Sequence, residues 1–344
     1  MIRAAIVGGT GYGGMELLRL LLAHPGVELG ALTSRTQTGP VAADHPHLRG
    51  LTDLCFTQEK AVDLAREHDL LFFATPHGVC AKEAADVLAT NDHVKVIDLS
   101  GDHRLASAAD YETHYGKTHP HPELLDVAVY GTPECGARDA VRGARLVANP
   151  GCHAYATLLA LYPLYAAGLV TGRASVFSVT GSSGSGAKPS GGTHHPERFG
   201  NFKAYRPLDH QHVPEIELSL DRISDVPVAF DFVPHSGPFA RGIHVTALVP
   251  VESDDEAIAV TALESAYADE PFVRMLPAGE QPQVRAVAGS NFADVGVKPG
   301  RGTLCVTIAI DNLGKGMAGT AVQNLNLACG LDETAGLQQP GVGL

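Results

Sequence analysis

Short apolar runs alternate with longer stretches of helical apolar spacing through the first 150 residues. Strands are predicted at 3–7, 27–33, 69–75 and 94–99, with shorter candidates at 127–130 and 145–148, and helices at 14–23 and 79–90. The run at 69–75 is nearly all apolar, which is typical of a parallel strand buried on both faces. Strands that alternate with helices predict an α/β fold with a Rossmann-type, doubly wound parallel sheet.

The second half has a different pattern, with alternating apolar positions in longer strands. Strands are predicted at 176–180, 229–233, 243–251 and 303–310, and helices at 154–166, 254–268 and 317–329. This pattern favours a second α+β domain with a mixed or antiparallel sheet. We expect one domain over 1–150 and a second domain over 151–316. The final helix, about 317–344, is expected to complete the first domain, which lacks a closing element before residue 151.

Composition supports a folded, globular chain and narrows its partners. The 344 residues are 44% hydrophobic and 18% charged, which excludes a disordered chain. A formal net charge of -13 argues against a nucleic acid or an anionic membrane as the partner. The sequence contains no run of 18 apolar residues, so a membrane span is not predicted. The N-terminal residues lack a signal-peptide pattern. We expect a cytoplasmic protein.

A glycine motif lies between the first predicted strand and the first predicted helix. Gly8, Gly11 and Gly14 fit G-x-x-G-x-x-G, with Thr10 and Tyr12 between them. Glycines permit a tight turn and the close approach of backbone N–H groups to a pyrophosphate, which the helix N-terminus then stabilises. The motif predicts a dinucleotide site, although an ordinary strand-to-helix turn would need similar residues.

The cofactor type follows from the end of the second strand. An acidic residue there would accept a hydrogen bond from the ribose of NAD, whereas this chain has Ser34 and Arg35. A hydroxyl and a guanidinium suit a 2′-phosphate, so NADP(H) is favoured. Pro76, after the 69–75 strand, is expected near the cofactor because ligands of parallel sheets bind at the carboxyl ends of the strands.

One cysteine differs from the other five. The six cysteines include no C-x-x-C pair, so a structural zinc site is not expected. Cys152 follows Asn149-Pro150-Gly151 and precedes an apolar helical run. A helix N-terminus stabilises a thiolate, which is the nucleophilic form of cysteine. The alternative is a small hydrophobic residue at a turn.

Two further segments carry candidate functional residues: a loop that could bind an anion, and a pair of histidines that could exchange a proton with Cys152. The glycine- and serine-rich residues 181–186, followed by Lys188, resemble an anion-binding loop. His210 and His212 would lie on one face if their segment were extended. A metal is disfavoured because no third ligand stands at a suitable spacing, and an acid or base partner of Cys152 is the better use of these imidazoles.

These motifs occur in an order that resembles the N-acetyl-γ-glutamyl-phosphate reductase family. The matching segments are Gly8-x-Thr10-Gly11-Tyr12-x-Gly14, Asn149-Pro150-Gly151-Cys152, Gly181-x-Ser183-Gly184-x-Gly186, His210-x-His212-x-Pro214-Glu215-Ile216, Arg241-Gly242-Ile243 and Asp311-Asn312-Leu313-x-Lys315-Gly316. The resemblance covers essentially the whole chain.

The resemblance implies NADPH-dependent reduction of an acyl phosphate in arginine biosynthesis. It makes Cys152 the nucleophile that forms a thioester and assigns proton transfer to a histidine, without separating His210 from His212. It implies that residues 1–150 form an NADP-binding domain, that residues 151–316 form a catalytic and oligomerisation domain, and that the protein is a homodimer or homotetramer. It also implies cofactor contacts from Ser183, Gly184 and Asn312 and substrate contacts from Asn149, Ser182, Lys188 and Arg241.

The chain departs from the family pattern at two positions, and the second departure weakens a simple account of how the phosphate is held. His153 stands where many members have an aromatic residue, and Ala187 occupies the position where an arginine is usual. The stretch 194–198 also resembles a sister enzyme of lysine biosynthesis, which reduces an aminoadipyl phosphate bound to a small acidic carrier protein. An aspartyl-phosphate enzyme and an NADP-binding sensor without turnover are further alternatives.

Overall fold

The computed structural model describes residues 1–343, which divide into two compact units. The first unit comprises Met1–Pro150 and Met317–Gln338, and the second comprises Gly151–Gly316 together with the residues from Gln339 onward. The C-terminal segment expected to join the first unit therefore does so only as far as Gln338. Within residues 1–343, no helix has the length and apolar composition needed to cross a bilayer.

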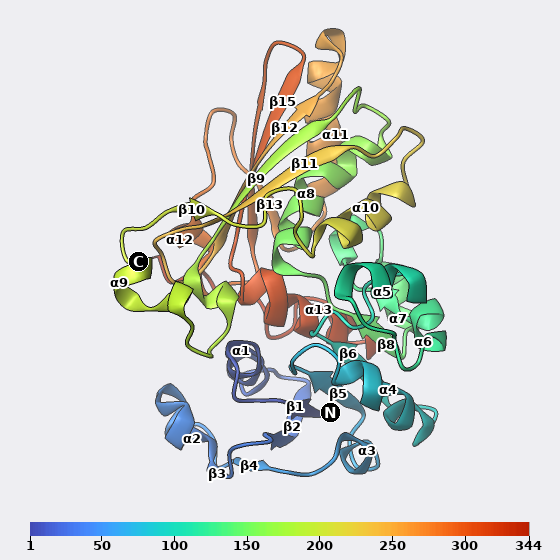
Figure 1. Ribbon diagram of the computed structural model, residues 1–344, viewed down its shortest axis with the longest axis vertical. Coiled ribbons are helices and arrows are strands. Elements are labelled where there is room, and N and C mark those ends of the chain that lie inside the picture. The colour runs from blue at the N-terminus through green and yellow to red at the C-terminus, as the bar shows by residue number, and fades with distance from the viewer. Residues whose placement is uncertain (344) are drawn as a thin grey trace. The chain divides into compact units, whose positions relative to one another are not determined.

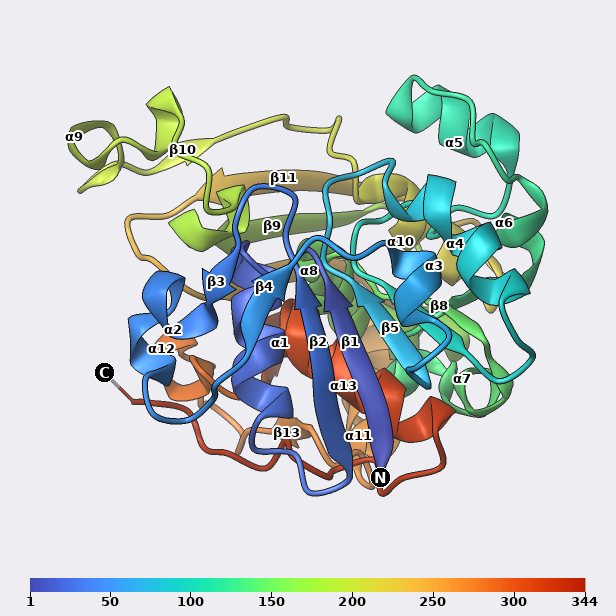
Figure 2. The ribbon, with the colours of Figure 1, turned by 90° about the horizontal axis from the view of Figure 1, so that it is seen from below.

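The first unit is built on a sheet that has eight strands among the described residues, and Figure 2 shows β2, β1 and β5 next to one another. In sheet order the strands are β3 (Gly39–Pro40), β4 (Cys55–Thr57), β2 (Val27–Thr33), β1 (Ile2–Val7), β5 (Leu70–Phe73), β6 (Lys95–Asp98), β8 (Leu146–Ala148) and β7 (Val129–Tyr130). Neighbouring strands are parallel except for β3, which pairs antiparallel with β4. The predicted doubly wound parallel sheet is confirmed.

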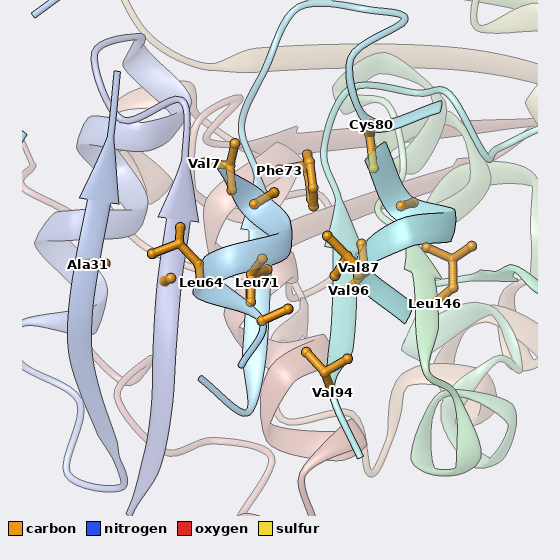
Figure 3. Close-up of a cluster of buried hydrophobic side chains, with 14 residues drawn as sticks. Val7, Ala31, Leu64, Leu71, Phe73, Cys80, Val87, Val94, Val96 and Leu146 are labelled. Atoms are coloured by element: carbon orange, nitrogen blue, oxygen red, sulfur yellow. The ribbon is translucent and has the colours of Figure 1, made fainter. Parts of the chain in front are cut away.

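Helices cover this sheet because its strands are apolar on both faces. The helices of the first unit are α1 (Tyr12–Leu21), α2 (Val41–Asp44), α3 (Ala61–Leu64), α4 (Cys80–Ala89), α5 (Ala108–Tyr115), α6 (Glu123–Val127), α7 (Arg138–Gly143) and α13 (Gly319–Ala328). Alternate strand residues such as Val7, Leu71 and Val96 form a core with Leu64 of α3 and Val87 of α4 (Figure 3). Burial of this cluster holds the strands in place, and with them the turns that follow β1 and β5.

Helix α13 is buried although it carries several amide side chains. Gln323 donates to Glu134 and Glu333, and Asn324 donates to the carbonyl of Gly131 and to Asn149. Hydrogen bonds of this kind remove the cost of burying polar groups. The helix thereby joins distant segments of the first unit, and it was predicted at 317–329 from its apolar spacing.

The second unit has a mixed sheet with seven strands among the described residues. In sheet order these are β10 (Lys203–Ala204), β11 (Phe230–Ser236), β9 (Ala174–Thr180), β12 (Ile243–Pro250), β15 (Thr303–Ile310), β14 (Ala293–Pro299) and β13 (Val273–Met275). The pairs β11–β9 and β13–β14 are parallel, and the others are antiparallel. No strand is predicted from the sequence at β10, β13 or β14, because β14 includes a glycine and two charged residues and the other two are very short.

Helix α8 (Cys152–Ala166) is the central helix of the second unit. It is apolar on all sides, and Leu158, Leu159 and Leu161 are fully buried. Helices α8 and α11 (Glu256–Tyr267) lie along one face of the sheet, and α10 (Val213–Asp221) packs against α8 (Figure 1). Two short helices, α9 (His195–Arg198) and α12 (Val284–Val287), complete the unit.

The opposite face of this sheet carries exposed apolar residues. Phe177 on β9 and Leu248 on β12 are 41% and 40% exposed, whereas their neighbours in each strand are buried toward the helices. A sheet that presents large apolar side chains on its uncovered face is typical of an interface.

Candidate active site

Cys152 is the first residue of α8, so its side chain stands at the positive end of a long helix. Gly151 is the N-cap in an extended conformation, and no side chain caps the helix. At Gly316 a Cβ would lie only 2.8 Å from Cys152 Cβ, so this passing segment must be glycine. The N-terminus of α8 therefore offers backbone donors that can stabilise negative charge beside Cys152.

Glu215 and His212 lie against Gly151, the residue that precedes Cys152. The Gly151 N–H donates to Glu215 Oε2 at 3.1 Å, and His212 Nε2 is 3.8 Å from Glu215 Oε1. A Cβ on Gly151 would come within 2.6 Å of His212 Nε2. The glycine thus allows an imidazole and a carboxylate to approach the backbone at Cys152.

His210 joins this group through a turn and not through an extended segment. His212 is the N-cap of α10 with helical dihedrals, so the condition of an extended segment is not met here. The His210 and His212 rings still meet edge to face, with centroids 4.7 Å apart. The backbone N–H of His212 donates to His210 Nδ1. Burial, with a smaller effect of Arg206, lowers the pKa of His210 to about 4. Its neutral ring therefore presents Nε2–H as a donor.

His153 connects this group to two hydroxyl groups. Its Nδ1 is 2.6 Å from Ser178 Oγ, and its Nε2 is 2.8 Å from the Tyr205 hydroxyl oxygen. Burial lowers the pKa of His153 to about 3, with a further effect of His210. Burial and the nearby Cys152 raise the pKa of Tyr205, which therefore stays protonated. Tyr205 is thus bonded to the residue that follows Cys152 and lies within reach of the charge on Cys152.

The glycine- and serine-rich loop follows β9 in the same unit. The N–H groups of Gly181, Ser182 and Ser183 donate to the carbonyls of Gly242, Phe239 and Ala240. Ser183 also exchanges hydrogen bonds with Asn312, whose Oδ1 accepts from the Gly242 N–H at 2.6 Å. The predicted residues Ser183 and Asn312 are thus in contact. Since the three N–H groups are bonded within the protein, an anion here would be bound through other donors of the loop.

The two predicted substrate cations lie in different surroundings. Lys188 is exposed on the loop. Arg241 is half-buried, and its Nε is 2.5 Å from the buried Asp311 carboxylate. Asp311 also accepts from the N–H groups of Leu313 and Gly314. Arg241 is therefore held in place by a carboxylate that orders the chain around Asn312.

Asn149, the fourth predicted substrate residue, belongs to the first unit. It is fully buried, and its amide donates to the carbonyl of Met317 and accepts from Asn324. These contacts fix the chain after β8.

The glycine turn of the first unit forms an open cradle. Gly8 has a φ of +90°, and a Cβ at Gly9 or Gly14 would overlap Leu32 or the backbone of Gly9. At Gly11, the N-cap of α1, a Cβ would meet nothing within 4 Å, and no side chain caps the helix. The turn thus leaves space at a helix N-terminus, and this cradle fits a pyrophosphate. Thr10 is half-buried, and Tyr12 is 36% exposed.

The expected ribose-side residues follow β2. Ser34 is buried, and its Oγ accepts from the N–H groups of Thr36 and Gln37, which shapes the turn. Arg35 is exposed and has space to contact a phosphate. Pro76 is exposed after β5, and His77 beside it pairs with Asp102 at 2.6 Å.

Three residues of the cluster around Cys152 escaped the sequence analysis as functional candidates. Glu215 stands three residues after His212, and this spacing before a helix could have suggested that the two meet. Tyr205 and Ser178 gave no such signal, because only the fold brings β9 and residue 205 to the start of α8.

Comparison with known families matches both units. Residues 3–144 match the family model described as "Semialdehyde dehydrogenase, NAD binding domain", and residues 152–312 match "Semialdehyde dehydrogenase, dimerisation domain". An aspartate semialdehyde dehydrogenase II from Vibrio cholerae has a TM-score of 0.68 at 18% identity, covering 95% of this chain and 98% of that chain. One from Candida albicans, solved with NADP, has a TM-score of 0.69 at 13% identity over 95% of this chain and 98% of that chain. The fold is that of a semialdehyde dehydrogenase.

Curated relatives narrow the class to one family. The chain is 46% identical to N-acetyl-gamma-glutamyl-phosphate reductase of Nitrosococcus oceani, with 99% of both chains covered. It is also 46% identical to the Laribacter hongkongensis protein of the same name, with 98% of both covered. The chain belongs to the N-acetyl-gamma-glutamyl-phosphate reductase family, and the resemblance read from its motifs is confirmed.

Proposed function

We propose that this chain reduces N-acetyl-γ-glutamyl phosphate to N-acetylglutamate 5-semialdehyde and phosphate, with NADPH as the reductant, in arginine biosynthesis. The observation that carries the proposal is Cys152 at the N-terminus of α8, with His212 and Glu215 at the preceding residue. Membership of the family supplies the substrate, since the curated relatives of this chain carry that activity in their name.

Cys152 is the nucleophile of this reaction. Its thiolate attacks the γ-acyl carbon, the C–O bond to phosphate breaks, and phosphate leaves with the electron pair, so that a thioester remains on Sγ. The N-terminal N–H groups of α8 stabilise the oxyanion of the tetrahedral adduct. After reduction the adduct collapses, the semialdehyde leaves and the thiolate is restored.

His212 is the residue best placed to accept the proton of the Cys152 thiol. Its Nε2 lies beside Gly151 and 3.8 Å from Glu215, whose carboxylate stabilises an imidazolium. His210 suits a different role, because its Nδ1 already accepts from the His212 N–H and burial keeps its ring neutral. His210 therefore acts as an Nε2–H donor toward negative charge.

The first unit binds the cofactor through the cradle of Gly8, Gly11 and Gly14, with Thr10 and Tyr12 beside it. Bound NADPH supplies a hydride to the carbonyl carbon of the thioester. Ser34 and Arg35 follow β2, where a hydroxyl and a guanidinium match a 2′-phosphate. Pro76, Ser183, Gly184 and Asn312 are the further predicted cofactor contacts.

Substrate recognition is assigned to Asn149, Ser182, Lys188 and Arg241. Arg241 is the strongest of these, because Asp311 holds its guanidinium in place and a carboxylate or phosphate can share it. We further propose a homodimer or homotetramer built on the exposed sheet face around Phe177 and Leu248. The name of the matching family model, a dimerisation domain, supports this use of the second unit.

A carrier-bound aminoadipyl phosphate is the competing substrate. The stretch 194–198 that resembles the lysine enzyme lies at α9, on the surface of the second unit. Both substrates would react at Cys152, so the choice depends on the acyl chain. Offering each acyl phosphate with NADPH at equal concentration separates the two, and comparable rates would contradict the assignment to arginine biosynthesis.

The proposal is tested with Cys152→Ser and Cys152→Ala. Without the thiolate, turnover falls by at least about 10³-fold, while circular dichroism and unfolding stay near those of the wild type. Adding the acyl phosphate without NADPH to the wild-type protein leaves an acetylglutamyl group on the Cys152 peptide, seen by mass spectrometry and released by hydroxylamine. Retained turnover in Cys152→Ser, or an acyl group on another residue, refutes the mechanism.

A further inference from the structure

Three polar side chains form a row from the core of the second unit to the position of Cys152. Ser178 on β9 is fully buried, with Oγ 2.6 Å from His153 Nδ1. His153 Nε2 is 2.8 Å from the Tyr205 hydroxyl oxygen. His153 directly follows Cys152 in the first turn of α8, so Tyr205 is bonded to the residue next to the proposed nucleophile, and the charge of Cys152 acts on Tyr205.

The tautomer of His153 follows from the donors that must be satisfied. Burial lowers its pKa to about 3, so the ring carries one N–H at neutral pH. Among residues 1–343, the hydroxyl of Ser178 has His153 Nδ1 as its single hydrogen-bond partner. If Nδ1 carried the hydrogen, the buried Ser178 proton would lack an acceptor, which is costly. Ser178 therefore donates to Nδ1, and His153 donates from Nε2 to Tyr205.

This tautomer sets the direction of the Tyr205 hydroxyl. The oxygen accepts from His153, so its own proton is available to another acceptor. Within residues 1–343 this proton is not hydrogen-bonded, to Cys152 Sγ or to another acceptor, so a bond to Cys152 would form when the thiolate or the adduct carries negative charge. Burial and the charge of Cys152 both raise the pKa of Tyr205, which keeps the hydroxyl protonated. A protonated hydroxyl beside a thiolate is a hydrogen-bond donor to it.

We propose that Tyr205 donates this hydrogen bond to the negative charge at Cys152, first on Sγ and then on the acyl oxygen of the adduct. Ser178 and His153 are positioning residues that hold Tyr205 in this direction. The proposal rests on the proposed thioester chemistry of Cys152. It also gives His153, which departs from the usual aromatic residue of the family, a definite role, because a phenylalanine there has no N–H to donate.

A double-mutant cycle of Tyr205→Phe and His153→Phe tests the row. Tyr205→Phe lowers kcat by about 10–100-fold, as expected for one lost donor to an oxyanion, with little change in KM. His153→Phe lowers kcat by roughly tenfold through loss of orientation, and Ser178→Ala by less. In the Tyr205→Phe background, His153→Phe adds less than about twofold, because its effect is transmitted through Tyr205.

A second readout follows the free protein and does not need turnover. The rate of iodoacetamide alkylation at Cys152, measured by mass spectrometry across pH, has its midpoint shifted upward in Tyr205→Phe and in His153→Phe. The matched control is Tyr165→Phe. It removes a hydroxyl from α8, the helix of Cys152 and His153, and this hydroxyl is bonded to the backbone of Ala229. Tyr165→Phe changes thermal unfolding and leaves both the midpoint and kcat unchanged.

Two results overturn the proposal. One is a Tyr205→Phe protein with kcat and alkylation midpoint both like the wild type. The other is a full effect of His153→Phe in the Tyr205→Phe background, which would mean that His153 acts independently. Failure of the proposed function is recognised separately, since Cys152→Ser would then keep turnover, or the acyl group would not appear on Cys152.

Discussion

Gly11 offers a way to test the nucleotide cradle without disturbing the fold. A Cβ at this position meets no atom within 4 Å, and the backbone is extended with a negative φ. Gly11→Ala should therefore change the free energy of unfolding by about 1 kcal/mol or less, the range for an alanine in place of glycine at an N-cap. The methyl group instead occupies the space at the helix N-terminus that the pyrophosphate needs.

The expected loss of cofactor affinity can be sized from the hydrogen bonds involved. A displaced pyrophosphate loses one charge-assisted bond to backbone N–H groups, worth about 1.5–3 kcal/mol. This corresponds to an increase of roughly 10- to 150-fold in the dissociation constant of NADPH. The assay is a titration of NADPH followed by fluorescence or calorimetry, with unfolding measured on the same samples.

Two further variants make the result decisive. Gly143→Ala, at the end of α7, also places its Cβ in open space and should change neither affinity nor stability appreciably. Gly9→Ala should destabilise the fold by about 1–3 kcal/mol, because its Cβ would lie 2.2 Å from Leu32 Cδ1. Unchanged NADPH affinity in a folded Gly11→Ala protein would refute the assignment of this turn to the pyrophosphate.

Three other predictions concern cofactor choice, acid stability and assembly. Arg35→Ala should raise the KM for NADPH by about tenfold or more and leave the KM for NADH nearly unchanged, in steady-state assays. An equal change in both KM values would mean that Arg35 does not contact the 2′-phosphate. His153 and His210 have folded pKa values of about 3 and about 4, both below the unfolded value, so their stabilisation is present above that value and is lost as pH falls toward the folded values. Each accounts for roughly 2 kcal/mol between pH 7 and pH 5. In urea unfolding, the free energy of unfolding of His153→Phe should fall less between pH 7 and pH 5 than that of the wild type, by this amount. An unchanged pH dependence of the free energy of unfolding would contradict the prediction. Phe177→Glu should lower the mass seen in sedimentation, whereas Glu252→Gln, an exposed change after β12, should not; an unaltered mass would place the interface elsewhere.

Much of the fold could be predicted because its strands carry strong local signals. The apolar runs that became β1, β2, β5 and β6 and the glycine turn at Gly8 depend on neighbouring residues, and the structure bears them out. Strands such as β14 were missed because their side chains follow no simple alternation. Their pairing is decided by long-range contacts with β15 and β13.

In the candidate site, too, residues with a local sequence signal could be predicted, and residues that only the fold brings together could not. Cys152 could be singled out from its place between a predicted strand and helix, and His210 and His212 from their spacing. The turn that brings these two imidazoles together could not, because it depends on the N-cap of α10. Tyr205 and Ser178 are 27 residues apart in the chain numbering and meet only through His153, a contact that no local pattern contains.

The interruption of the first unit by residues 151–316 has a consequence for folding during synthesis. The second unit is continuous except for the residues from Gln339 onward, so its sheet and α8 can be completed once Gly316 has left the ribosomal exit tunnel. The first unit must wait for α13, whose amides satisfy Gly131, Glu134 and Asn149. Until then its parallel sheet lacks one of its covering helices, and exposed apolar surface of this kind recruits chaperones. A released chain that ends at Gly316 should therefore contain a protease-resistant second unit attached to a protease-sensitive N-terminal segment.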